Sequence, residues 1–282
     1  MHTRTRIALL TGLTAIVSAC GGGGGNGTPP ASAAITTGTF SDSVVQGIAF
    51  DCGGTQSTTD VAGHFTFVSG QTCTFKVGGV SLGSAPGAPG APQLSPVDLV
   101  PGAVDETNPT VNNITRFLMS LDSDGNPANG ITIAPAVATA LASATLDFSL
   151  APTAFAPLAT SLVTSVIPGG TLVSAAAAST HLAATLLGLF SGSYNCPYAG
   201  TASGSVSISI TGGVISGTGS PAGGPVSFGV SGMLASSGSA NIVQSGSTTN
   251  GAVFSGTFKT DGTASGTWTA GSDSGTWTCT KA

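Results

Sequence analysis

Charged residues are scarce in this sequence, and basic residues are the scarcest class. The 282 residues include six Lys and Arg and eleven Asp and Glu, which gives a formal net charge of -5. After residue 19 the basic residues are Lys76, Arg116, Lys259 and Lys281, and they form no cluster. Phosphate neutralisation needs clustered basic side chains. The sequence therefore predicts no nucleic-acid partner and no basic membrane-binding surface.

Low charge is not a sign of disorder here, because hydrophobic residues make up 40% of the chain. Disordered chains usually combine high net charge with few branched apolar residues. Charged residues amount to 6% of this sequence, against roughly 25% in an average globular protein. Gly, Ser, Thr and Ala take their place. This composition favours a β-rich exported protein whose surface is coated with hydroxyl groups.

The N-terminus lacks an apolar run long enough to span a bilayer. Residues 7–17 are apolar, whereas a spanning helix needs about 20 such residues. Arg4 and Arg6 precede this short run, so residues 1–19 are predicted to be a signal peptide. The segment Val17-Ser18-Ala19-Cys20 resembles the lipobox of bacterial lipoproteins. The resemblance implies cleavage before Cys20 and acylation of its thiol, as with palmitate; the alternative is an ordinary secretory signal with a chance cysteine.

Residues 20–35 are expected to form a flexible tether that carries the lipid. Five consecutive glycines, 21–25, cannot contribute to a core, and Gly-rich chains behave as flexible coils. Several acyl chains on one residue anchor a protein stably in a membrane. Enteric lipoproteins are retained in the inner membrane by an Asp after the lipidated cysteine. By that resemblance, Gly21 implies the outer membrane, at its periplasmic face or at the cell surface.

Four cysteines remain after Cys20: Cys52, Cys73, Cys196 and Cys279. An even number in an exported chain indicates disulfides, and sequence alone allows three pairings. No Cys-x-x-Cys occurs, and neither His64 nor His181 is near a cysteine, which argues against a metal site. We predict the pairs Cys52–Cys73 and Cys196–Cys279, because each pair lies within one compositional block.

Residues 36–133 are predicted to form a small β-module followed by a helix. Apolar and polar side chains alternate over 36–83, and Gly78-Gly79 predicts a hairpin turn. The Pro- and Gly-rich segment 84–92 is expected to be a loop outside any sheet. Asn108 before a proline is typical of a helix start. The apolar residues 111, 114, 118 and 121 then fall on one helix face.

The second half of the chain separates into a helical segment and a β-domain. Ala-rich helices are predicted over 135–146, 153–166 and 172–187, within a helical segment at 134–188. Residues 189–282 then contain mainly Gly, Ser, Thr and β-branched residues. Turn signals at roughly ten-residue spacing predict about eight strands there.

The cysteines and glycines of the β-domain suggest its topology. Cys196 lies in the first predicted strand and Cys279 in the last, so a disulfide between them would close an antiparallel meander into a barrel without edges. The unit Ser-Gly-Thr recurs at 216–218, 255–257, 265–267 and 274–276. Glycines so placed fit tight curvature or small interior positions. The aromatic residues Phe254, Phe258, Trp268 and Trp277 are expected to fill the interior or line one face. The predicted fold class is α+β, mostly β.

Four segments of the first half of the chain form a recognisable set: Thr59-Asp-Val-Ala-Gly-His-Phe-Thr-Phe67, Leu94-Ser-Pro-Val-Asp-Leu-Val-Pro-Gly-Ala103, Asn108-Pro-Thr-Val-Asn-Asn-Ile114 and Leu121-Asp-Ser-Asp-Gly-Asn-Pro127. Through them, about a third of the chain resembles a module of proteobacterial cell-surface and adhesin-like proteins. The resemblance implies no defined catalytic role. The C-terminal β-domain is similar in composition to the Gly/Ser/Thr-rich domains of small envelope lipoproteins.

A loop after the predicted helix offers a candidate metal site. Asp122, Asp124, Asn126 and Asn129 place oxygens at alternating positions, as in the first half of a calcium-binding EF-hand loop. The sequence departs from that loop, with Pro127 at the invariant glycine position and Ile133 at the position of the bidentate Glu. The same residues suit an Asx turn that satisfies its own hydrogen bonds. Both interpretations stay open on sequence alone.

Three further residues carry reactive groups, and each has a more ordinary explanation. Ser81 lies in a Gly-x-Ser-x-Gly pattern, but a serine hydrolase needs a strand-to-helix turn there, and a Pro/Gly loop follows instead. His64 is expected within a strand, with Asp60 across a turn and out of reach. His181 is expected at the edge of the helical core. The sequence therefore predicts no catalytic residue.

These observations predict a lipid-anchored cell-envelope protein with a structural, adhesive or surface-contact role and no catalysis. Its expected partners are the membrane, through the lipid, and envelope or host-surface components. The alternative is a lipoprotein that binds a small apolar ligand in its C-terminal barrel. That alternative requires a cavity of roughly 300 Å³ or more.

Overall fold

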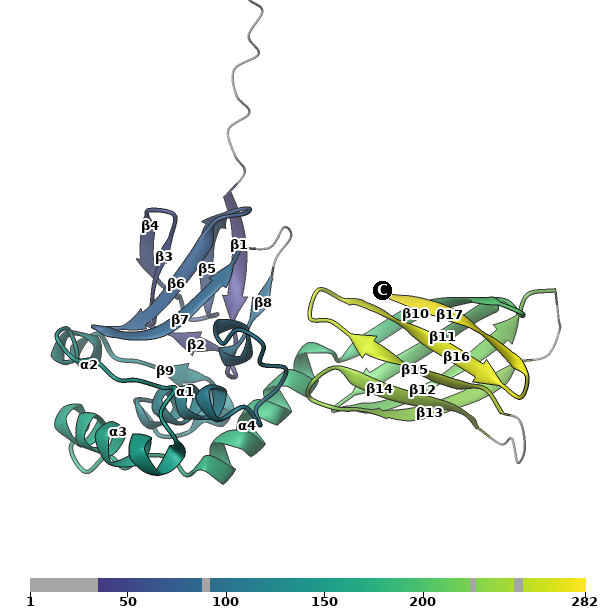
Figure 1. Ribbon diagram of the computed structural model, residues 1–282. Coiled ribbons are helices and arrows are strands. Elements are labelled where there is room, and N and C mark those ends of the chain that lie inside the picture. The colour runs from purple at the N-terminus through teal and green to yellow at the C-terminus, as the bar shows by residue number, and fades with distance from the viewer. Residues whose placement is uncertain (1–34, 88–91, 224–226, 246–250) are drawn as a thin grey trace, which may run out of the picture. The chain divides into compact units, whose positions relative to one another are not determined.

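The structure is a computed structural model that describes residues 35–87, 92–223, 227–245 and 251–282 (Figure 1). The predicted signal peptide and Cys20 lie outside the described residues. Strands predominate over helices, and a closed barrel forms the C-terminal part. The predicted fold class, α+β with mostly β structure, is confirmed.

The first part of the chain contains two main sheets that share a phenylalanine core. One has the strand order β5-β1-β8 and the other the order β4-β3-β6-β7, while β2 and β9 form a separate parallel pair. The bounds are β1 Ile35–Phe40, β2 Val45–Gln46, β3 Ala49–Cys52, β4 Thr55–Thr58, β5 His64–Val68, β6 Thr72–Val77, β7 Val80–Pro86, β8 Gln93–Leu94 and β9 Ile131–Thr132. Phe65 of β5 meets Phe75 of β6 edge to face, with ring centroids 5.2 Å apart. This buried contact joins the two sheets.

The predicted hairpin at Gly78-Gly79 is confirmed, because β6 pairs with β7 across it. The expectation that residues 84–92 stay outside any sheet is wrong for their first part. Ser84, Ala85 and Pro86 pair with β6. A proline is tolerated there because β7 is the edge strand of its sheet and Pro86 is its last residue.

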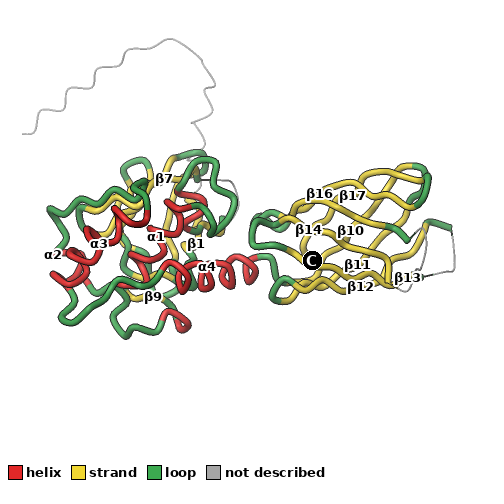
Figure 2. Tube along the Cα trace, turned by 60° about the horizontal axis from the view of Figure 1, so that its bottom comes forward, coloured by secondary structure: helices red, strands yellow, loops and turns green. Residues whose placement is uncertain are grey.

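Helices follow the β-module, and their bounds are α1 Pro109–Ser120, α2 Pro135–Ala140, α3 Pro152–Val166 and α4 Ala175–Leu189, with 3-10 turns η1 Pro96–Leu99 and η2 Pro127–Asn129 (Figure 2). The Asn108 side chain accepts hydrogen bonds from the backbone of Thr110 and Val111, which confirms the predicted cap. Val111 and Leu118 are fully buried, as the helical spacing predicts. Helix α1 packs against both α3 and α4.

Eight consecutive strands close into an antiparallel barrel, as predicted (Figure 1). They are β10 Gly192–Gly200, β11 Gly204–Thr211, β12 Val214–Pro221, β13 Phe228–Leu234, β14 Ser239–Ser245, β15 Val253–Phe258, β16 Thr263–Ala270 and β17 Asp273–Lys281. The first strand pairs with the last, so no strand is left as an edge. Among the described residues, no helix is both long and apolar enough to cross a membrane.

The recurring Ser-Gly-Thr unit is explained by the two faces of the barrel strands. In Ser265-Gly266-Thr267 the hydroxyl residues are exposed, while Gly266 faces inward between buried Ala264 and Trp268. Trp277 of β17 lies opposite Gly266. A β-carbon on Gly256 would lie 2.5 Å from the Trp277 ring. The glycines therefore make room for the indole rings, and the predicted aromatic interior is confirmed.

Candidate functional site

The loop that follows α1 holds the residues of the predicted metal site. The Asp122 carboxylate accepts a hydrogen bond from the backbone N–H of Thr132 at 2.9 Å. The two oxygens of Asp124 accept bonds from the backbone N–H of Asn126 and from Nδ2 of Asn129, each at 2.9 Å. The structure thus brings all four predicted residues into one loop. It also contains the Asx turn that the alternative interpretation expects.

One oxygen in this loop is left without a partner. Asp122 is buried, with 6% of its surface exposed, and its Oδ2 makes no hydrogen bond among the described residues. Asp122 and Asp124 are two residues apart in this loop. Burial and the neighbouring Asp124 raise the pKa of Asp122, whereas the hydrogen bond from Asn129 lowers the pKa of Asp124.

A second polar cluster joins α4 to the turn between β1 and β2. Asp42 Oδ1 lies 3.3 Å from His181 Nε2, and Ser43 Oγ lies 3.4 Å from the same nitrogen. The backbone N–H of Ser43 donates to Thr185 Oγ1 at 2.9 Å, one helical turn beyond His181. Ser43 has a φ of 56°, and no other described non-glycine residue has a positive φ. These contacts hold α4 against the turn.

Within this cluster, Asp42 is the residue whose burial is energetically most unfavourable. Its side chain is fully buried, and neither oxygen makes a hydrogen bond among the described residues. The approach of His181 Nε2 therefore does not have hydrogen-bond geometry. Burial raises the pKa of Asp42 well above its usual value. No sequence signal points to this arrangement, because Ser41-Asp42-Ser43 has the composition of an exposed turn and His181 is far away in the chain.

The cluster does not have the geometry of a catalytic triad. A triad places the carboxylate on one ring nitrogen of His and the hydroxyl on the other, whereas Asp42 and Ser43 both approach Nε2. An open groove of about 590 Å³ lies over the cluster and is lined mainly by small residues, including Ala184 and Gly188. His181 lies at the edge of the core, with 14% of its side chain exposed, as expected.

The other reactive residues stay apart from these clusters. Asp60 was expected beyond reach of His64, which is wrong: its Oδ2 lies 3.1 Å from His64 Nδ1. The turn that precedes β5 folds Asp60 back onto the histidine, and about half of each side chain is exposed. Ser81 lies within the edge strand β7, and residues 84–86 continue that strand. It is not at a strand-to-helix turn.

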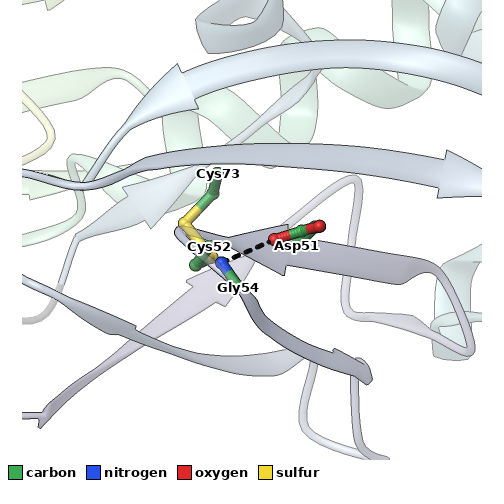
Figure 3. The surroundings of a disulfide bond; sticks show 4 residues. All are labelled: Asp51, Cys52, Gly54 and Cys73. Carbon is green, nitrogen blue, oxygen red and sulfur yellow. Dashed lines mark hydrogen bonds between the residues drawn. A yellow bond between two sulfur atoms is a disulfide. The ribbon is translucent and has the colours of Figure 1, made fainter.

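Both predicted disulfides are present. Cys52 of β3 lies directly opposite Cys73 of β6, and Cys196 of β10 lies in register with Cys279 of β17. Figure 3 shows the first bond beside a tight turn, where the Asp51 carboxylate accepts a hydrogen bond from the backbone N–H of Gly54. Each bond ties neighbouring strands together, and the second also closes the barrel.

No group of three or more His, Cys, Asp or Glu side chains in the described ranges is arranged to hold a metal ion. A calcium site can also use amide oxygens, which the Asp122 loop supplies through Asn126 and Asn129. Neither a protein-family model nor a curated protein matches this chain.

Proposed function

We propose that this chain is a lipid-anchored cell-envelope protein that acts by surface contact and not by catalysis. Acylation of Cys20, which the lipobox-like segment implies, would anchor it to the outer membrane. The two disulfides support the proposal, because such bonds persist in oxidising compartments outside the cytoplasm.

The exterior of the barrel is the observation that carries the contact role. On β16, Thr263, Ser265, Thr267 and Thr269 lie opposite Thr280, Thr278, Thr276 and Ser274 of β17, and all are exposed. Asp273 and Lys281, at the two ends of β17, are the charged residues of the eight described barrel strands. A neutral wall of hydroxyl groups suits hydrogen bonding to polar envelope or host-surface components. It offers no basic patch for nucleic acid.

The interior of the barrel favours the surface-contact role over binding of an apolar ligand inside the barrel. The space enclosed by the interior residues, including Ile242, Phe254 and Trp277, is about 10 Å³. Ligand pockets commonly measure about 300 Å³ or more. The ring packing leaves little room, since Tyr198 contacts both Phe254 and Trp268 edge to face. Ligand binding in the barrel would require these rings to move.

Metabolic labelling tests the anchor. Cells that express the full chain and are fed radioactive palmitate should label the wild-type protein, and Cys20→Ser should lose both the label and membrane fractionation. Cys20 is the change to make because the other cysteines are paired in disulfides. An unlabelled wild-type protein, or a Cys20→Ser variant that is processed and fractionates normally, would refute the lipid anchor.

Surface proteolysis of intact cells tests the contact role separately. A protein exposed at the surface should be digested without lysis, while a periplasmic control protein stays intact. Complete protection, together with labelling by palmitate, would retain the anchor and exclude contact with host surfaces.

A further inference from the structure

Two carboxyl groups, those of Asp122 and Asp124, lie two residues apart in the loop after α1. Three of their four oxygens accept bonds from Thr132, Asn126 and Asn129. The fourth, Asp122 Oδ2, is buried and has no hydrogen-bond partner among the described residues. Neighbouring carboxylates repel each other unless a proton or a cation offsets their charge. The unpartnered oxygen is therefore the feature that requires an explanation.

Neither the last turn of α1 nor any ion pair among the described residues places a basic side chain beside this pair. Helix α1 ends at Ser120, and its last turn contains no basic residue. The C-terminal end of a helix carries partial negative charge, which disfavours carboxylates placed there. The ion pairs formed by the described side chains involve Asp60 and Asp42, not this loop. A bound cation would offset the repulsion, the helix dipole and the burial of Asp122 together.

We propose that the loop from Asp122 to Asn129 binds one calcium ion. Asp122 Oδ2 and the Asp124 carboxylate are its charged ligands, and the side-chain oxygen of Asn126 is a neutral one. Asn129 donates to Asp124, so it orients that carboxylate instead of binding the ion. Calcium accepts flexible sets of oxygen ligands completed by water, whereas magnesium requires a near-ideal octahedron. The exposed side chains of Asp124 and Asn126 leave the remaining positions open to water.

Calorimetric titration of the chelator-treated full chain tests this site with calcium chloride as the probe. Binding is expected with a Kd of about 0.1 to 1 mM, the range of extracellular calcium modules. Calcium at about 10 mM should raise Tm by about 5 °C. The titration measures calcium binding to the loop whether or not Cys20 is acylated, so its outcome is independent of the proposed anchor.

Asp122→Asn is the decisive variant, because its amide can donate to Asp124 where the cation would lie. It should abolish the calcium heat while leaving Tm without calcium unchanged or higher. Asp124→Asn, at an exposed position, should weaken calcium binding at least about tenfold. Asp147→Asn is the matched control, since Asp147 forms an Asx turn with Ser149 elsewhere in the chain, and it should bind calcium normally.

Three results would overturn the proposal. The first is a wild-type protein that shows neither heat nor a Tm shift with calcium. The second is wild-type affinity retained in Asp122→Asn, or in Asp124→Asn where Asp122→Asn fails to fold. The third is magnesium binding with the same affinity, which would reject calcium as the ion selected by this loop.

Discussion

At the scale of single residues, Asp42 shows how one side chain can oppose the fold that contains it. Its carboxyl is fully buried beside His181, and burial raises its pKa well above the usual value. The folded protein therefore takes up a proton at this position more readily than the unfolded chain does. The stability that this group contributes is full below the unfolded pKa, and it is lost as pH rises toward the folded pKa.

Asp42→Asn removes this titratable group. The free energy of unfolding of the variant should therefore increase relative to that of the wild type as pH rises. At pH 5 the two proteins should differ little, and at pH 8 the variant should be more stable by about 1 to 3 kcal/mol, the usual cost of an unsatisfied buried polar group. Urea unfolding at both pH values measures the difference.

The same change at Asp51 is the control for this experiment. Asp51 is partly exposed, and hydrogen bonds from the side chain of Gln56 and the backbone of Gly54 lower its pKa. Its contribution to stability is present above the unfolded pKa, so Asp51→Asn should not gain on the wild type as pH rises. A variant of Asp42 that behaves like the Asp51 variant would contradict the expected cost of the buried Asp42 carboxylate.

At the scale of secondary-structure elements, the barrel strands depend on glycine at inward positions. A β-carbon on Gly266 would overlap the backbone of Ser255 and Gly256 on the neighbouring strand, and one on Gly256 would meet the Trp277 ring. Helix α4 presents the opposite case, because a β-carbon on Gly188 has open space around it. The same residue type is thus required in one element and dispensable in the other.

Gly266→Ala and Gly188→Ala should therefore shift stability in opposite directions. The barrel substitution should cost about 1 to 3 kcal/mol through overpacking. The helix substitution should add up to about 1 kcal/mol, because alanine loses less backbone entropy than glycine in a helix. Guanidinium unfolding of both variants provides the comparison. Equal effects of either sign would contradict the proposed role of the inward glycines.

The elements also show which parts of the fold could be predicted from sequence. Local signals sufficed for the cap at Asn108, the hairpin at Gly78-Gly79 and the barrel strands, since each depends on neighbouring residues. The prediction that Pro86 lies outside any sheet was wrong, because the effect of a proline depends on whether its strand lies at a sheet edge. That is a property of the whole sheet. The disulfides gave the long-range pairing of β10 with β17.

At the scale of the whole molecule, the two candidate sites also differ in how far they could be predicted from sequence. The residues of the Asp122 loop are close in sequence, so their spacing pointed to them, although the unpartnered Oδ2 depends on burial that spacing does not reveal. Ser43 and His181 are separated by 138 residues, and no motif links them. Their meeting follows from packing of α4 against the β1–β2 turn, which only the structure shows.

The two disulfides should contribute unequally to stability, because they close loops of different length. Their cysteines are separated by 21 and by 83 residues. Chain entropy predicts about 3.3 kcal/mol for the shorter loop and about 4.5 kcal/mol for the longer one. Replacing Cys196 and Cys279 by alanine should therefore cost about 1 kcal/mol more than replacing Cys52 and Cys73.

Tryptophan fluorescence can assign each loss of stability to its part of the chain, because both tryptophans, Trp268 and Trp277, lie in the barrel. Removing the Cys196–Cys279 bond should move the tryptophan transition to lower denaturant concentration. Removing the Cys52–Cys73 bond should leave that transition nearly in place and shift the far-UV circular dichroism transition instead. If both pairs move the tryptophan signal equally, the barrel and the β-module unfold as one cooperative unit, and loop length alone then decides the larger loss.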